Sequence, residues 1–412
     1  MAALSLALTD DRDGYYLHRL IQRLMHRQRA YQVREDYTTG DHPLPIGDPR
    51  YARALNYLAK KARTNYVGLA QSAVTDRMRV RAFKFGGEVS EEAMKIWKAN
   101  NMAMNSQIAI KKASSLSDVY ALVSPPREEG GQPVITIEDP RVCIVEPDPL
   151  DPLQAVVGLK FYEDFAINKV IAILYYPEKV VIFQGPGMVD FLQRETSYNP
   201  ENIVNSAGGF KKVKTFPNPI GKVPLIRGPW QPEYGLQGMA ECEAGGWDIQ
   251  DRINKGILDR LVVMQSQAYR QRWVTGAKSL KGSGKAKHLT FDPGADMIWA
   301  VVDEGAQFGD FAQADLKGPL EATRDDVGDF SAVTQTPVSY LTNKMVNVSG
   351  ETLTAAQASL VSKIKTRMDV MGWFFEQVMK LCFLYQGNTE LANDIEAETM
   401  WVDPEMRSMT EI

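Results

Sequence analysis

Two spacings of apolar residues divide the chain into helical and strand-like parts. Over much of the chain, apolar residues recur every three or four positions, which is the period of one face of an α-helix. Between residues 117 and 193 the pattern changes to short runs rich in Val, Ile and Tyr. Pro, Gly and Asp separate these runs, as in strands joined by turns. The pattern therefore predicts an α+β protein.

The expected elements follow from these spacings. Helices are expected over residues 13–35, 48–75, from 90 onward, 105–115, 245–272, from Pro319 to before Pro337, and from Ser349 onward. Strands are expected over 77–85, 119–123, 134–137, 142–145, 156–161, 170–175 and 180–183. Loops are expected over residues 198–209 and 339–348. The run 400–408 is expected to start another element, and we expect a further C-terminal piece beyond it.

The stretch from Gly245 to Pro337 is the most unusual part of the chain. A long helix is followed by a Gly- and Lys-rich segment over 275–287 that is too polar for a core. A second helix is expected to begin at Pro319, because proline suits the first helical position, and to end before Pro337, whose ring blocks continuation. The sequence thus predicts two helices that leave the body, present a small β tip and return.

The predicted helix 13–35 combines an apolar stripe with six arginines. The stripe consists of Leu17, Leu20, Ile21, Leu24, Met25 and Tyr31, and the arginines are at positions 12, 19, 23, 27, 29 and 34. Such a helix can lie on a membrane surface or on nucleic acid. Alternatively, it is a peripheral helix of the fold whose arginines are solvated or paired with neighbours.

Composition excludes several classes of protein. The 412 residues carry 47 basic and 51 acidic side chains, a net charge of −4, so binding of nucleic acid would require local basic patches. Cys143, Cys242 and Cys382 are far apart, which indicates reduced thiols in an intracellular protein. Residues 1–8 lack a charged segment typical of a signal peptide, and the apolar runs are too short for a transmembrane span.

No enzymatic motif has the required spacing. A phosphate-binding loop would need glycine where Ser279 stands and a hydroxyl residue where Ala286 follows Gly284 and Lys285. The four histidines, at positions 18, 26, 42 and 288, form no zinc motif, and no nucleophile elbow is present. The adjacent Asp325 and Asp326 point in different directions on a helix and indicate a solvated face rather than a metal site. We expect neither an enzyme nor a cofactor.

Short motifs spread along the chain resemble one known family. They are residues 37–45 (YTTGDHPLP), Trp97 with Asn100, 138–140 (EDP), 218–226 (NPIGKVPLI), 250–255 (QDRINK), 271–276 (QRWVTG), 336–341 (TPVSYL) and 348–353 (VSGETL). Their order and coverage are similar to those of the portal proteins of tailed bacteriophages, in particular the siphophage type of Gram-positive hosts.

This resemblance implies a structural role in the virion. Portal proteins form a ring, commonly of twelve subunits, at one capsid vertex, and double-stranded DNA passes through it during packaging and ejection without sequence-specific contacts. The implied partners are the terminase large subunit, the head–tail adaptor, and the major capsid and scaffolding proteins. The implied location is the capsid portal vertex, and the host cytoplasm during assembly. The alternative from a different class is an adaptor that docks on nucleic acid or a membrane through its basic first helix.

The resemblance also implies a division of the chain into parts. These are a wing (1–244), a first stem helix (245–272), a small β clip (273–313), a second stem helix (314–335), a tunnel loop (336–348), a long return helix through the wing (349–395) and the start of a crown (396–412). The fold expected is thus a portal-like α+β protomer. A helix pair with one apolar seam and two polar flanks suits packing around a hole, because a ring buries surface that a single hairpin leaves exposed.

Three groups of residues are expected to act in this role. The clip interface would be a basic rim of Lys278, Lys281, Lys285 and Lys287. The channel lining would be acidic, because residues 310–330 hold six acids and two bases, and its members would be Asp315, Glu321, Asp325, Asp326 and Asp329. The tunnel loop would touch the DNA backbone through Thr342, Asn343, Lys344 and Met345.

Overall fold

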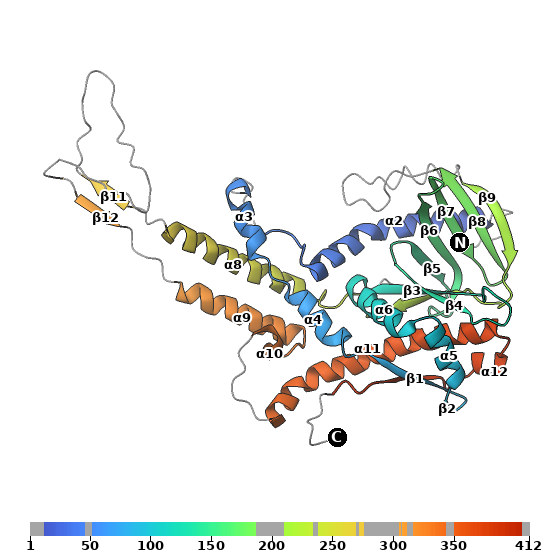
Figure 1. Cartoon of the computed structure of the whole chain (residues 1–412). Helices are drawn as coiled ribbons and strands as arrows, with labels where there is room; N and C mark the ends of the chain where they lie inside the picture. The colour runs from blue at the N-terminus through green and yellow to red at the C-terminus, as the bar shows by residue number, and fades with distance from the viewer. Residues whose placement is uncertain are drawn as a thin grey trace.

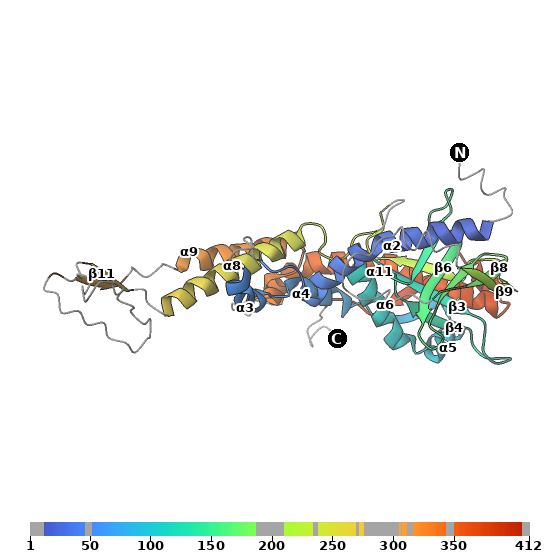
Figure 2. The same ribbon diagram turned by 90° about the horizontal axis from the view of Figure 1, so that it is seen from above.

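The computed structural model describes residues 12–45, 52–186, 210–233, 238–268, 272–275, 305, 307–310, 316–342 and 350–405. Its shape is elongated, with a thick body at one end and a pair of helices that projects from it (Figures 1 and 2). The helices are α2 (Arg12–Thr39), α3 (Ala52–Ala62), α4 (Tyr66–Thr75), α5 (Glu91–Ala99), α6 (Met102–Leu116), α8 (Gly246–Ala268), α9 (Lys317–Val333), α10 (Val338–Leu341), α11 (Gly350–Tyr385) and α12 (Thr389–Ala392).

The strands form four small sheets. They are β1 (Val80–Phe85), β2 (Glu88–Val89), β3 (Asp118–Ser124), β4 (Val134–Glu138), β5 (Cys143–Pro147), β6 (Ala155–Asp164), β7 (Lys169–Tyr175), β8 (Lys179–Pro186), β9 (Lys211–Pro217), β10 (Leu225–Pro229), β11 (Arg272–Thr275), β12 (Gln307–Asp310) and β13 (Glu398–Trp401). The strand orders are β13-β1-β2, β10-β3-β4, β11-β12 and β5-β6-β7-β8-β9, and all described pairings are antiparallel. The α+β class predicted from the sequence is confirmed.

The five-stranded sheet and α2 share one core. The whole apolar stripe predicted for the first helix is buried, and all of it except Tyr31 joins a cluster with Ile144, Leu159, Ala172 and Val181 of the sheet. The helix ends at Thr39, and Gly40 follows with a φ of +84°, the left-handed conformation that glycine adopts most readily at a helix C-terminus. The second alternative from the sequence, a peripheral helix that belongs to the fold, is therefore the one observed.

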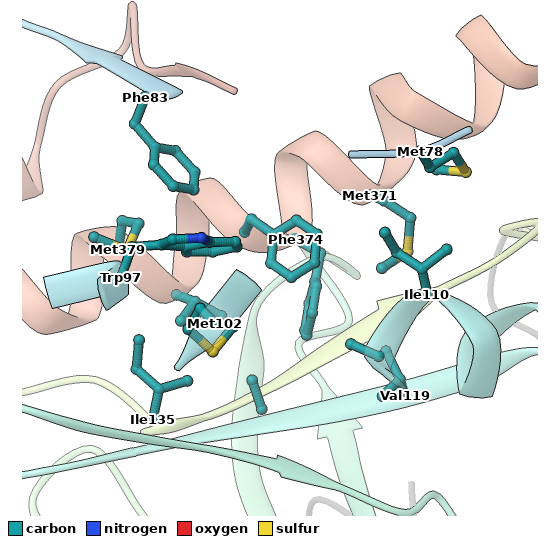
Figure 3. Close-up of a cluster of buried hydrophobic side chains, with 14 of the residues drawn as sticks. Met78, Phe83, Trp97, Met102, Ile110, Val119, Ile135, Met371, Phe374 and Met379 are labelled. Atoms are coloured by element: carbon teal, nitrogen blue, oxygen red, sulfur yellow. The ribbon is translucent and has the colours of Figure 1, made fainter. Parts of the chain in front are cut away.

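A second core lies under α11. This 36-residue helix packs against β10, β3 and β13, and its buried residues meet those of α5, α6 and β1. Figure 3 shows part of this cluster, in which Trp97 and Phe374 lie between Phe83 and Val119. The ring of Trp97 contacts that of Phe83 edge-on at a centroid distance of 5.0 Å. Apolar burial of this extent is the main force that holds α11 along the body.

Several predicted elements differ from those observed. The single helix expected over 48–75 is two helices, because tertiary hydrogen bonds engage the intervening backbone: the Thr64 amide donates to Asn254 Oδ1 (3.0 Å) and the Tyr66 amide to Gln250 Oε1 (2.9 Å). The Asn65 side chain then caps α4 by accepting from the Gly68 amide (2.8 Å). The second projecting helix begins at Lys317, so Pro319 is in its first turn but is not its first residue.

Other differences concern strands and turns. The loop expected over 339–348 starts with the short helix α10, and the helix-capping role expected for Ser349 lies outside the described residues, as does the loop expected over 198–209. The sequence pattern missed β9 and β10, whose residues lack a clean alternation of apolar and polar positions. The run 400–408 was expected to start a new element, yet its first residues end β13, which pairs with β1 in the body.

Candidate functional site

The projecting pair, defined here as α8 and α9, lies side by side in both views, with β11 and β12 beyond its far end (Figures 1 and 2). At its base, Ile249 and Ile253 of α8 meet Val327 and Phe330 of α9 in one buried cluster. Farther out, the opposite side of α8 packs on α3, where Leu258 is buried against Ala59 and Ala62. The helical period of these residues is what the sequence predicted for this segment.

The two helices approach closely at a glycine. A Cβ built on Gly256 would lie 2.8 Å from Thr323 Oγ1, which is closer than a real Cβ comes to another atom. That oxygen donates a hydrogen bond to the Pro319 carbonyl (2.9 Å), so it is held in place. Gly256 therefore sets the separation of α8 and α9 at this level.

Acidic side chains occupy the exposed face of α9. Glu321, Asp325 and Asp329 are exposed and follow one another at intervals of four residues, opposite the buried Val327 and Phe330. The Asp329 carboxylate accepts a hydrogen bond from Arg252 of α8 (3.0 Å). Arg252 also forms an ion pair with Asp326 at 2.9 Å. Glu321 and Asp325 make no ion pair within the described part of the chain. The fifth predicted member, Asp315, lies outside the described residues.

The exposed face of α8 has a mixed charge. It carries Asp248, Arg252, Lys255 and Asp259, of which Lys255 and Asp259 pair with each other. Because this face carries two acids and two bases, it differs from the exposed face of α9, where the nearest bases are Lys317 and Arg324. The two sides of the pair are thus electrostatically distinct.

The base of α8 is fixed by buried polar groups. Gln250 and Asn254 are fully buried, and both accept hydrogen bonds from the backbone amides described above. Their side chains also bind Thr64 Oγ1, which donates to Asn254 Oδ1 (2.9 Å) and accepts from Gln250 Nε2 (2.9 Å). Asn254 also contacts the ring of His42. Both polar residues belong to the 250–255 motif quoted above, so part of that motif serves to attach α8 to the segment between α3 and α4.

Aromatic stacking adds to this attachment. The ring of Tyr37 lies parallel to that of Trp247, with centroids 4.5 Å apart and planes at 4°, and it also stacks on His42 with centroids 5.3 Å apart. The Tyr37 hydroxyl donates to Asp251 Oδ2 (2.8 Å). Burial lowers the pKa of His42, and the nearby Asp251 carboxylate offsets that effect only in part. The imidazole is therefore neutral at pH 7.

A buried ionic cluster at the base of the projecting pair joins the segment before α8 and the segment after α9 to α11. Glu241, just before α8, accepts from Trp230 Nε1 (2.7 Å), Lys363 Nζ (3.0 Å) and Arg367 Nε (3.3 Å). The same Lys363 ammonium donates to the carbonyl of Thr334, just after α9 (2.6 Å). Burial raises the pKa of Glu241, but the two cations outweigh burial and hold that pKa below its ordinary value.

The sequence analysis missed this cluster. The available signal was weak: Lys363 and Arg367 are basic residues one turn apart, each followed by an apolar residue of the buried face, Ile364 and Met368. A third connection comes from α2, where Arg34 binds both carboxylate oxygens of Glu243 at 2.9 and 3.0 Å and also donates to Ser117 Oγ (2.8 Å). The segment that precedes α8 is thus held from two sides.

The predicted tunnel loop and clip are described only in part. Thr342 is half-buried at the end of α10, whereas Asn343, Lys344 and Met345 lie outside the described residues. On the two sides of that gap, Arg77 hydrogen-bonds to both the Tyr340 hydroxyl and Gln357 Oε1. Of the clip, β11 and β12 pair in antiparallel fashion, and Lys278, Lys281, Lys285 and Lys287 fall outside the described ranges.

Neither a metal site nor a membrane span is found where the structure is described. In those residues, no three His, Cys, Asp or Glu side chains are grouped so that they could hold a metal ion. No described helix is sufficiently long and apolar to cross a membrane. All three cysteines are buried and free, as the sequence predicted.

The chain is similar in sequence to phage portal proteins. The sequence model of a family described as "Phage portal protein, SPP1 Gp6-like" matches residues 15–412. The portal proteins of Mycobacterium phages D29 and L5 are each 22% identical over 354 residues, which cover 83% of this chain and 69% of theirs. Among solved structures, similar chains come from the virion and from the neck, computed with C12 symmetry, of a native gene transfer agent particle. Each match covers 86% of this chain and 85% of the other, with a TM-score of 0.42 and identities of 11% and 10%.

Proposed function

Because the chain belongs to the SPP1 Gp6-like family of phage portal proteins, we propose that copies of it form the ring at one capsid vertex through which double-stranded DNA enters and leaves. The protein is a virion component of a structural, non-enzymatic family, and the resemblance stated from its sequence motifs is confirmed. A ring of twelve subunits and a host among Gram-positive bacteria stay predictions. The match over residues 15–412 is the observation that carries this function.

In the proposed ring, the projecting pair is the stem and its α9 face lines the channel. Glu321 and Asp325 are exposed and unpaired within the described part of the chain, and Asp329 shares one arginine with Asp326. A ring multiplies these charges by the number of subunits. Since DNA binding depends on contacts between cations and phosphates, an acidic wall lets the duplex slide without adhering.

The remaining divisions follow the expectation from the sequence. We assign the body to the wing, β11 and β12 to the clip, and α11 to the return helix, while residues after 396 stay the predicted start of a crown. The two views support the assignment of the stem, because α8 and α9 leave the body together (Figures 1 and 2). The basic-helix adaptor is not favoured, because the apolar stripe of α2 is buried against the five-stranded sheet.

The proposed partners divide between the two ends of the ring. The clip lysines at 278, 281, 285 and 287 would contact the terminase large subunit during filling and the head–tail adaptor afterwards, and the body would contact the major capsid and scaffolding proteins. Replacing the four lysines by Glu should leave rings intact and weaken docking of motor or adaptor, because electrostatic attraction is lost. Unchanged docking of the variant ring would exclude these lysines from the interface.

The tunnel loop is proposed as the constriction of the channel. Lys344 carries one positive charge, and residues 342–345 contain no acid, so the loop can touch phosphates without reading sequence. Lys344→Glu in an infectious phage should leave rings assembled but impair packaging or retention of the genome. Normal packaging and retention would remove Lys344 from the mechanism.

Electron microscopy tests the proposed function directly. Purified protein, or particles that contain it, should show end-on rings with a central hole, and capsids assembled without the protein should lack DNA. DNA-filled capsids formed in its absence would contradict the proposal, because the ring is proposed as the sole route of entry.

A further inference from the structure

A basic pocket of about 630 Å³ lies in the body, between α2, the loop from β5 to β6, β10 and α11. Its charged lining consists of Arg23, Arg27, Lys222, Arg227 and Lys380, against Asp151 and Glu233. Five bases and two acids give a lining charge of +3. The whole chain has a net charge of −4, so this concentration of positive charge is local. The pocket is separate from α8 and α9.

Part of this positive charge is not paired by any residue that the structure describes, although, against the effect of burial, the Asp118 carboxylate that binds Arg227 also raises the pKa of Arg27. Arg23 pairs with Glu146, and Arg227 binds Asp118 Oδ1 at 2.7 Å. In contrast, Arg27, Lys222 and Lys380 make no side-chain hydrogen bond or ion pair with any described residue. Of these, Arg27 is only half-exposed, so its guanidinium is placed where water is limited. A site of this kind favours an anion from outside.

A buried hydroxyl at the pocket supplies the second observation. Tyr120 lines the pocket and is 0% exposed, and its phenolic oxygen has no hydrogen-bond partner among the described residues. Burial, followed by the Asp118 carboxylate, raises the pKa of Tyr120 to about 12, so the phenol is protonated and can donate a hydrogen bond. Buried polar groups are rarely left unpaired. Because this hydroxyl is fully covered, a ligand supplies its acceptor only by moving the side chains that cover it on entry.

The other walls are apolar. They include Pro152, Pro232, Trp373 and Leu381, and the rim carries Leu150, which is 94% exposed, and Leu153, which is 61% exposed. A loop with two exposed leucines beside a pocket presents apolar surface that a partner can cover. An occupant that matches both features has a negative group for Arg27 and apolar side chains for this rim.

We propose that this pocket binds an acidic peptide segment of a partner protein, with a carboxylate at Arg27 and the Tyr120 hydroxyl and apolar side chains against Leu150, Leu153 and Trp373. Arginine binds carboxylates in a planar, two-point geometry, which suits it to this role. Nucleic acid fits less well, since a duplex presents phosphates on a convex surface and has no apolar side chains for the rim. The proposal does not depend on the acidic channel lining.

Two peptide pools provide the test. One contains nine-residue peptides with Asp or Glu flanked by Leu, Val and Phe, and the other has the matching Asn and Gln; both carry a neutral fluorophore. Fluorescence anisotropy with the full chain should show binding of the acidic pool alone. Arg27→Ala should weaken binding at least tenfold, and Tyr120→Phe should weaken it severalfold. Arg29→Ala is the matched control, because Arg29 is exposed on the same helix and does not line the pocket.

Folding of the variants is controlled by their thermal midpoints. Tyr120→Phe removes a hydroxyl that makes no hydrogen bond with any described residue, so the variant should unfold at or above the temperature of the wild type. Equal binding of the two pools, or equal binding by Arg27→Ala and Arg29→Ala, would overturn the proposal. If a short DNA duplex displaced the acidic pool from the wild-type protein, the pocket would be assigned to DNA. If Arg27→Ala changed the oligomeric state, the pocket would be assigned to a second copy of this chain. Either result would overturn the proposal.

Discussion

Single residues show how the projecting pair is attached, and Lys363 is the most informative of them. Its ammonium contacts Glu241 ahead of α8 and Thr334 behind α9, and the two paired side chains are only 8% and 4% exposed. A buried ion pair adds little net stability compared with an apolar replacement of both partners. Loss of one partner, however, leaves the other charge buried without full compensation.

Lys363→Met should therefore destabilise the protein strongly, by about 3 kcal/mol, because Glu241 keeps only Arg367 and Trp230. Urea unfolding followed by circular dichroism measures the change. Lys365→Met is the matched control on the same helix, since Lys365 is exposed and, among the described residues, forms an ion pair only with the exposed Glu405. Equal stabilities of the two variants would show that the cluster is not important for folding.

A pH dependence should follow from His42. Nε2 of His42 faces the Asn254 amide nitrogen and must accept a hydrogen bond from it. Protonation of the imidazole would place two donors, Nε2–H and the amide N–H, opposite each other. The pKa of His42 in the folded protein lies below 6.5, so its contribution to stability is present above pH 6.5 and is lost as the pH falls through the folded pKa. Thermal unfolding should shift to lower temperature between pH 7.5 and 5.5, and less so in His42→Gln.

His26 provides the comparison for that measurement, because its side chain is exposed. His26→Gln should keep the pH dependence of the wild type. If His42→Gln and the wild type lost the same stability on acidification, another group would be responsible.

Among the elements, α8 and α9 have sides of different character. Gly256 permits their close approach at Thr323, whereas Gly328 on α9 has no atom within 4 Å of a built Cβ. Alanine at Gly328 should stabilise the helix, because glycine is less favourable than alanine in a helix interior by about 1 kcal/mol. At Gly256 the same gain meets a clash with Thr323 Oγ1.

Gly256→Ala should consequently be less stable than Gly328→Ala by about 1–3 kcal/mol, the usual range for overpacking. Chemical denaturation of both variants gives the difference. Adding Thr323→Ala should restore much of the loss, because it removes the oxygen that the new methyl group would meet. Failure of this second substitution to restore stability would mean that the helices separate by another route.

The exposed face of α9 yields a prediction at the same scale. Glu321→Lys with Asp325→Lys should leave rings assembled but slow packaging, because new cation–phosphate contacts would retain DNA on the wall. The defect should diminish at higher salt, as counterion release predicts. Asp248→Lys with Asp259→Lys on the mixed face of α8 is the control, and an equal defect there would contradict the assignment of the α9 face to the channel.

Helices were more predictable than their connections. The apolar periods located α2, α8 and α11 because the buried residues of each recur at helical spacing. The helix expected from residue 90 onward is α5, which Ser90 caps. The break between α3 and α4 could not be predicted, because it depends on side chains of α8 nearly two hundred residues away. The same holds for β13, whose partner β1 lies at the other end of the chain. Clip and tunnel-loop residues stay predictions.

As a whole, the molecule leaves apolar side chains uncovered along the projecting pair. Met264, Val333 and the nearby Val338 are 51%, 51% and 46% exposed. Packing of neighbouring copies around a ring is one way to bury them, and that type of contact repeats from subunit to subunit. Met264 lies near the far end of α8, whereas Val333 and Val338 lie at the base of the pair. We propose both positions as contacts between subunits.

Met264→Glu with Val333→Glu should therefore shift the protein toward smaller assemblies, because charges would replace apolar contacts between copies. Light scattering measures the mass against the 46.1 kDa of one chain. Ile395→Glu is the control, since Ile395 is 93% exposed and lies after α12, in the body. Rings of unchanged mass and salt resistance in the double variant would place the subunit contact elsewhere.

The two bonds of Lys363 have a mechanical consequence. A force that pulls α8 along its axis relative to α9 acts on Glu241, just before α8, and on Thr334, just after α9. The ammonium group of Lys363 binds both residues. Sliding of one helix past the other must therefore break one of these bonds before it can proceed. Torque applied at the tip would therefore be transmitted through Lys363 to α11, and through α11 to the core of the body.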